Sequence, residues 1–117
     1  MEIPLFPLHA ELQPGDHLEL RIFEPRYLQM IKRVAGKKEG FGIVQIVAGS
    51  DAGPTPVIVD HGILATLVDF EARPDGLLGI KVLGERTFKI DKTWVLDDGL
   101  MMGEVTLHDD LPPAQGS

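Results

Sequence analysis

The stretch "GILATLVDFEARPDGLLGIKVLG", residues 62–84, has two apolar runs separated by the tetrapeptide Arg73-Pro74-Asp75-Gly76. Proline is preset for the second position of a tight turn, and glycine can take the positive φ that many such turns require. The pattern predicts an antiparallel β-hairpin. It makes β-structure the basis of the fold.

The segment that follows predicts a second hairpin. In "RTFKIDKTWV", residues 86–95, apolar Phe88 and Ile90 alternate with polar residues, which indicates a strand with one buried face. The tripeptide "DDG" at residues 97–99 is a turn signal, and in residues 104–108 apolar Val105 and Leu107 again alternate with polar residues. Two consecutive hairpins are therefore expected.

Three further segments upstream have strand character. "GFGIVQIV", residues 40–47, is almost continuously apolar and predicts a strand covered on both faces. "HLELRI", residues 17–22, alternates and predicts one buried face. "IPLFPL", residues 3–8, contains two prolines, which lack the N–H of a ladder, so we expect an edge strand or an irregular lead-in.

One helix is predicted, beginning at Pro25, which suits a first helical position, and closing at Gly36. Its apolar residues recur at helical spacing at Tyr27, Leu28, Ile31 and Val34. Basic residues gather near its end at Lys32, Arg33, Lys37 and Lys38. Cations there complement the helix dipole, an interpretation that we prefer to a binding patch.

These elements predict a mainly β (α+β) fold with six or seven strands and one short amphipathic helix between the early strands. Their hairpin order favours a twisted antiparallel sheet that closes toward a pseudo-barrel. A parallel α/β sheet would need a crossover helix between successive strands.

The chain of 117 residues has the length of one ordinary domain. We expect a β domain over residues 1–110 and a flexible tail over residues 111–117, where no periodicity remains. The Gly- and Pro-rich stretch at residues 48–56 is expected to be the most mobile internal loop.

Composition excludes several classes of function. The net charge of −7 repels phosphate backbones, so we expect no nucleic-acid partner. No apolar run is long enough to span a bilayer and the first residues do not resemble a signal peptide, so we expect no membrane partner and a cytoplasmic location. The absence of cysteine excludes disulfides, thiol catalysis and cysteine-based zinc sites.

Catalytic motifs are missing as well. The two serines, Ser50 and Ser117, stand in no G-x-S-x-G or S-x-x-K motif. The four histidines lack the i, i+4 spacing of a metal-binding pair; they are His9, His17, His61 and His108. No Walker A or complete G-x-G-x-x-G motif is present. We therefore expect no enzyme activity, no metal and no cofactor.

Several short motifs in order carry a family resemblance: "FPL", "LRIFEPRY", "FGIV", "GILATLVDFEARPDG", "GERTFKI" and "GEV". In this order they resemble the Lon N-terminal, or substrate-binding, domain, over about Ile3 to Leu107. The resemblance implies a PUA-like pseudo-barrel with a short helix. Many family members continue into a helical segment, so the chain is either a compact stand-alone member or a fragment.

The resemblance implies a non-catalytic domain that binds unfolded polypeptides, while ATPase and Ser-Lys peptidase domains elsewhere perform the chemistry of Lon. Two alternatives stay open. One is an assembly or adaptor module for a specific protein or for a copy of itself. The other is a barrel that binds a small ligand in a deep polar pocket.

Candidate contact residues come from three places. At the corner between residues 17–22 and the helix, Phe23 and Tyr27 are expected to anchor the core, and Arg26 to satisfy nearby backbone groups or to contact a partner. Met101 and Met102 should point to opposite faces of a strand, so that one is core and the other exposed. Trp94 could cover a sheet edge. The candidate polypeptide-binding residues are Phe23, Arg26, Tyr27, Trp94, Met101 and Met102.

Overall fold

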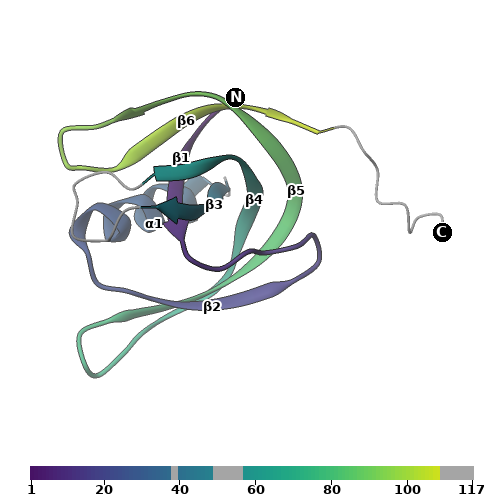
Figure 1. Ribbon diagram of the computed structural model, residues 1–117. Coiled ribbons are helices and arrows are strands. Elements are labelled where there is room, and N and C mark those ends of the chain that lie inside the picture. The colour runs from purple at the N-terminus through teal and green to yellow at the C-terminus, as the bar shows by residue number, and fades with distance from the viewer. Residues whose placement is uncertain (38–39, 49–56, 109–117) are drawn as a thin grey trace.

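The computed structural model describes residues 1–37, 40–48 and 57–108 (Figure 1). Its elements in chain order are β1 (Glu2–Leu8), β2 (His17–Ile22), α1 (Pro25–Lys37), β3 (Phe41–Ala48), β4 (Val57–Ala72), β5 (Leu78–Val95) and β6 (Met101–Leu107). The mainly β class with one short helix is confirmed. The loop expected at residues 48–56 and the tail expected at residues 111–117 lie, apart from Ala48, outside the described residues.

Strand β5 connects much of the sheet. The two segments expected as separate strands form one strand of 18 residues. Residues 78–83 pair with β2, residues 78–89 pair with β4, and residues 88–95 pair with β6, each time antiparallel. A strand that serves three partners along its length has to bend, and the sheet curves with it (Figure 1).

The sheet is mixed rather than wholly antiparallel. Its order is β2-β5-β4-β3-β1-β6, with β6 also paired to β5, and β1 runs parallel to β3. The expectation of a purely antiparallel sheet is wrong at this one pair. The physical reason is that β2 and α1 together form the connection between β1 and β3, which is long enough to return the chain in the same direction.

Strand β1 was expected to be an edge strand or an irregular lead-in, and this is wrong, because β1 pairs on both sides. Its first part, from Glu2 to Leu5, pairs with β6, and its second part, from Leu5 to Leu8, pairs with β3. Pro4 therefore has a partner only in β6, and Pro7 only in β3. Each proline can turn its missing N–H to the unpaired side, so no ladder hydrogen bond is lost.

Both predicted hairpin turns are confirmed, and they share one construction. Between β4 and β5, the Asp75 carboxylate accepts a hydrogen bond from the Leu77 N–H at 3.1 Å, and Gly76 has φ of 86°. Between β5 and β6, Asp98 accepts from the Leu100 N–H at 3.0 Å, and Gly99 has φ of 90°. An Asp-Gly pair thus encodes the same turn twice.

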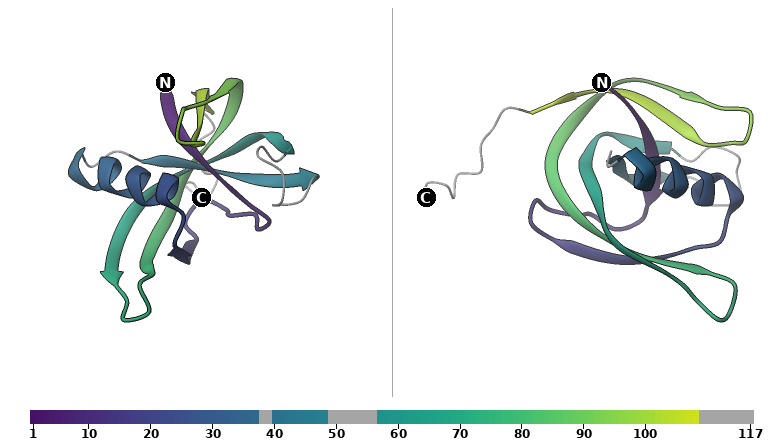
Figure 2. Two further views of the ribbon diagram at one scale, coloured as in Figure 1. Left: turned by 90° about the vertical axis from the view of Figure 1, so that its left-hand side faces the viewer. Right: turned by 180° about the vertical axis from the view of Figure 1, so that it is seen from behind.

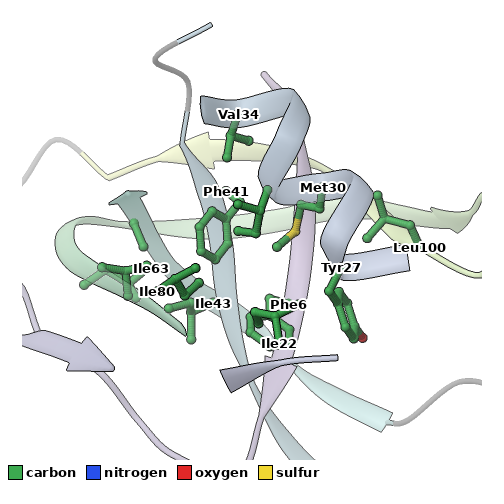
Figure 3. Close-up of a cluster of buried hydrophobic side chains, with 13 residues drawn as sticks. Phe6, Ile22, Tyr27, Met30, Val34, Phe41, Ile43, Ile63, Ile80 and Leu100 are labelled. Carbon is green, nitrogen blue, oxygen red and sulfur yellow. The ribbon is translucent and has the colours of Figure 1, made fainter. Parts of the chain in front are cut away.

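Two groups of buried apolar side chains lie on the sheet. The larger group lies under α1 and includes Tyr27, Met30 and Val34 from the helix with Phe6 and Phe41 from β1 and β3 (Figure 3). The smaller group consists of Ile3, Leu5, Val44, Phe88, Met101 and Val105. No helix among residues 1–37, 40–48 and 57–108 is long and apolar enough to cross a membrane.

Strand β3 was expected to be covered on both faces, and this is confirmed only for its first half. Phe41, Ile43 and Val44 are buried, whereas Val47 is 54% exposed. Two register shifts in the β3–β4 pairing fall in the second half, after Val44, where the strand leaves the core.

A close approach of β3 and β4 predicts the effect of a single methyl group. In Gly62→Ala, the new Cβ would lie 2.5 Å from the Ile43 carbonyl oxygen and 2.8 Å from Val44 Cγ1. Because the first of these is a backbone atom, relief requires the strands to move apart. We expect the free energy of unfolding to fall by about 1–3 kcal/mol, measured by chemical denaturation.

Gly79→Ala is the matched control, since its Cβ would find no atom nearer than 3.5 Å. Its free energy of unfolding should stay within about 1 kcal/mol of the unmodified protein. Equal stability of the two variants would contradict the close packing of β3 on β4.

Candidate functional site

The corner between β2 and α1 is tied to a distant turn. Arg26 Nη1 donates a hydrogen bond of 2.9 Å to the Gly99 carbonyl oxygen in the β5–β6 turn, and Arg26 Nε donates one of 3.0 Å to Glu24 Oε1. The helix begins at Pro25, as the sequence predicted. The expectation that Arg26 satisfies a backbone group is confirmed, so the corner joins the start of the helix to a hairpin.

Phe23 and Tyr27 differ in position, although both were expected to anchor the core. Tyr27 is buried, and its ring centroid lies 4.5 Å from that of Phe6, which confirms its core role. Phe23 is 66% exposed, so the expectation is wrong there. The reason is that Ile22 already occupies the last inward position of β2, and the residue after it points elsewhere.

Trp94 and the two methionines lie side by side in the β5–β6 pair. Met101 is buried in the smaller core group, while Met102 is half-buried and packs against the larger group. Trp94 is paired with Met102 and is half-buried, with Lys92 Nζ 5.6 Å from its ring centroid. Of these three residues, Trp94 and Met102 present surface.

An apolar groove that was not among the sequence-based predictions lies between α1 and the β4–β5 hairpin. Its volume is about 460 Å³. The residues that line it are Pro25, Leu28, Gln29, Ile31, Lys32, Ala35, Phe70 and Leu78. Among the residues that the structure describes, Lys32 is the only charged one in this lining. None of the six residues proposed from the sequence lines it.

The helix supplies one wall because its apolar stripe is wider than the core requires. Tyr27, Met30 and Val34 are buried in the core, and Leu28 and Ala35 extend the apolar surface to the side. Residues three and four apart share a helix face, so Leu28 and Ala35 reach the same groove together with Ile31. This excess width was the signal in the sequence that could have identified the wall.

The hairpin supplies the other wall. Phe70 pairs with Ile80 across the β4–β5 ladder, yet Phe70 is 57% exposed while Ile80 is buried. The left view of Figure 2 shows that the β4–β5 hairpin extends beyond β3 and lies beside α1. Phe70 lies in this extension, where β3 does not pair with β4. A large aromatic side chain is thus presented to solvent next to a helix face.

A second hollow lies near the same hairpin and is polar. It has a volume of about 410 Å³, and its charged lining residues are Glu19, Arg21, Asp69, Glu71, Arg73 and Lys81. Its three carboxylates and three cations balance, so the described lining carries no net charge that would attract an anion or a cation. No group of three or more His, Asp or Glu residues that could hold a metal exists in the part of the chain that the structure describes.

Comparisons with known proteins agree on one family. Residues 2–116 match the family described as the ATP-dependent protease La (LON) substrate-binding domain. The chain is 28% identical over 113 residues to a Lon protease from Parabacteroides distasonis; the match covers 95% of this chain but 14% of that protease.

Solved structures show the same relationship. The crystal structure of a Lon N-terminal domain protein from Xanthomonas campestris has a TM-score of 0.81 and 35% identity, covering 99% of this chain and 68% of that one. The N-terminal domain of a Mycobacterium avium complex Lon protease has a TM-score of 0.67 and 14% identity, covering 96% and 57%. The second likeness is one of fold.

The Arg26 contacts predict a cost in stability. Arg26→Ala should lower the free energy of unfolding by about 1–3 kcal/mol, because the hydrogen bond to Gly99 involves a charged donor and a partly buried carbonyl. Arg33→Ala, an exposed change on the same helix, should alter it by less than about 0.5 kcal/mol. Equal denaturation midpoints for the two variants would show that the corner is not held by Arg26.

Tyr27 predicts a pH dependence that can be read directly, because it is the single tyrosine of the chain. Burial raises the pKa of its phenol above the ordinary value of 10.0, and the neighbouring Arg26 charge opposes part of this rise. The folded state therefore holds the proton more tightly than the unfolded state, so stability falls as pH rises above about 10. An ultraviolet titration of the folded protein should give a midpoint above that of the protein unfolded in denaturant, and equal midpoints would contradict the burial.

Proposed function

Because the chain belongs to the family of Lon substrate-binding domains, we propose that its groove between α1 and the β4–β5 hairpin binds extended apolar segments of unfolded polypeptides. Non-catalytic substrate binding is the role of this family. The proposal assigns that role to a place on this chain. The observation that carries it is the groove, whose lining is apolar apart from Gln29 and Lys32.

Burial in folded proteins explains the selectivity that such a groove would have. Side chains such as Leu, Val and Phe lie inside folded proteins and are displayed when a chain unfolds. Covering them together with Phe70 and Leu28 removes apolar surface of both partners from water, which favours binding without a strict sequence requirement. The groove would thus distinguish unfolded from folded proteins by what each exposes.

The role of the whole protein is a further part of the proposal. The chain spans 14% of the length of the Lon protease that it resembles. In a protein of that kind, this domain would capture a substrate in the cytoplasm and hold it for the ATPase and peptidase domains. Any cleavage of the substrate would belong to those domains.

Fluorescence anisotropy with a labelled, permanently unfolded polypeptide tests the proposal. We expect saturable binding of this probe and none of a folded protein of similar charge. Phe70→Asp and Leu28→Asp should each weaken binding about tenfold or more, because a buried Phe or Leu side chain contributes about 1.5–3 kcal/mol.

Val47→Asp is the matched control, because Val47 is exposed to a similar extent as Phe70, at 54% against 57%, but lies outside the groove lining. It should leave the affinity within about twofold. Equal weakening by all three variants would assign binding to general surface apolarity. No binding of the unfolded probe would favour an assembly role for a specific protein partner.

A further inference from the structure

We propose that the polypeptide in the groove binds as an additional β-strand along the free edge of β4, and that the Asp69 carboxylate guards this edge until the polypeptide displaces it. The inference rests on the proposed function and specifies its binding mode.

The free edge arises because β4 extends beyond its pairing with β3. On one side, β3 pairs with β4 no further along than Ala65, while on the other side β5 pairs with β4 as far as Ala72. Within the described ranges, no strand pairs with residues 66–72 on the side away from β5. The left view of Figure 2 shows this end of β4 beside α1, and Phe70 within it lines the groove.

The direction of the backbone groups follows from the ladder. Arg73 N–H donates to the Leu77 carbonyl oxygen at 2.9 Å, so Arg73 turns its polar backbone groups toward β5. In an antiparallel pair alternate residues turn theirs to opposite sides, and the register is regular from Asp69 to Ala72. Phe70 and Ala72 therefore direct their N–H and C=O groups to the free edge, where a new strand could pair.

The backbone N–H of Phe70 already has a hydrogen-bond partner within the chain. The Phe70 N–H donates a hydrogen bond of 2.8 Å to Oδ1 of Asp69, in an exposed position. A register shift between Leu67 and Asp69 interrupts the ladder just before it. Charged residues and bulges are the usual means by which proteins protect free strand edges from unwanted pairing. Asp69 thus occupies the position that a carbonyl oxygen of an incoming strand would take.

The chemistry of the groove identifies the kind of strand that would displace the Asp69 carboxylate. The described residues of the lining are apolar with a single charge, on Lys32, which complements a carboxylate on the occupant. The partner is therefore an extended apolar segment of an unfolded chain that carries an Asp or Glu residue. Such a segment has free backbone amides, whereas the amides of a folded protein are already paired, so backbone pairing adds to the selection for unfolded chains.

Backbone N-methylation tests the strand mode. The probe is a labelled peptide of about eight residues that alternates valine and serine and ends with glutamate. Two versions carry N-methyl groups on alternate amides, one in each register, and their affinities for the 117-residue chain are measured by anisotropy. Strand addition uses the amides of one register only, so one version should bind about tenfold or more weaker while the other stays within about twofold.

The outcomes separate the two proposals. Equal affinity of both methylated versions and the parent peptide overturns strand addition and leaves groove binding intact. Failure of the parent peptide to bind, together with failure of the unfolded probe, overturns the proposed function itself.

Asp69→Ala tests the guarding role. Removing the competing acceptor should tighten binding of the parent peptide about two- to tenfold, the worth of one exposed hydrogen bond. Asp60→Ala makes the same change on the same strand, where the carboxylate lies 3.3 Å from Nδ1 of the exposed His61 side chain, and should leave the affinity within about twofold. Unchanged or weaker binding by Asp69→Ala would overturn the assignment.

The charge of Lys32 gives an independent check on the occupant. Lys32→Glu should weaken the glutamate peptide about threefold or more and should favour a peptide that ends with lysine instead. If the unmodified protein and Lys32→Glu both preferred the glutamate peptide to the same extent, the pairing of Lys32 with a carboxylate would be overturned.

Discussion

The hydrogen-bond ladder of β5 is the constraint on which the rest of the structure depends. Its 18 residues pair with β2 and β4 at one end and with β4 and β6 further along. Partners that succeed one another along a strand can be accommodated only if the strand bends. Register shifts lie next to both changes of partner, between Gly84 and Arg86 and between Ile90 and Lys92. The curvature of the sheet brings β6 back to β1 and encloses the smaller core group.

The candidate groove is a consequence of unequal strand lengths. Strand β4 has 16 residues and β3 has 8, so within the described ranges the end of β4 pairs on one side only. The helix follows β2, which pairs with the same end of β5, and so it packs beside this overhang. An apolar wall, an exposed Phe70 and a free backbone edge are thus brought together by topology rather than by one motif.

The corner at Glu24-Pro25-Arg26 shows how a conspicuous motif can have a structural role. Its charged side chain is engaged with Gly99 and Glu24, and Tyr27 is buried against Phe6. These contacts fix the start of α1 relative to the β5–β6 turn. The motif therefore positions one wall of the groove, while residues outside it, such as Leu28 and Phe70, supply most of the lining.

The sequence by itself determined the two Asp-Gly hairpins, the start of the helix at Pro25 and the family, because each depends on residues close together in the chain. Only the tertiary structure decided that β1 runs parallel to β3, that residues 78–95 form one strand and that Phe23 and Phe70 are exposed. Turn and periodicity signals act over a few residues. Strand pairing and burial depend on which distant segment packs opposite, and that is set by the topology of the whole sheet.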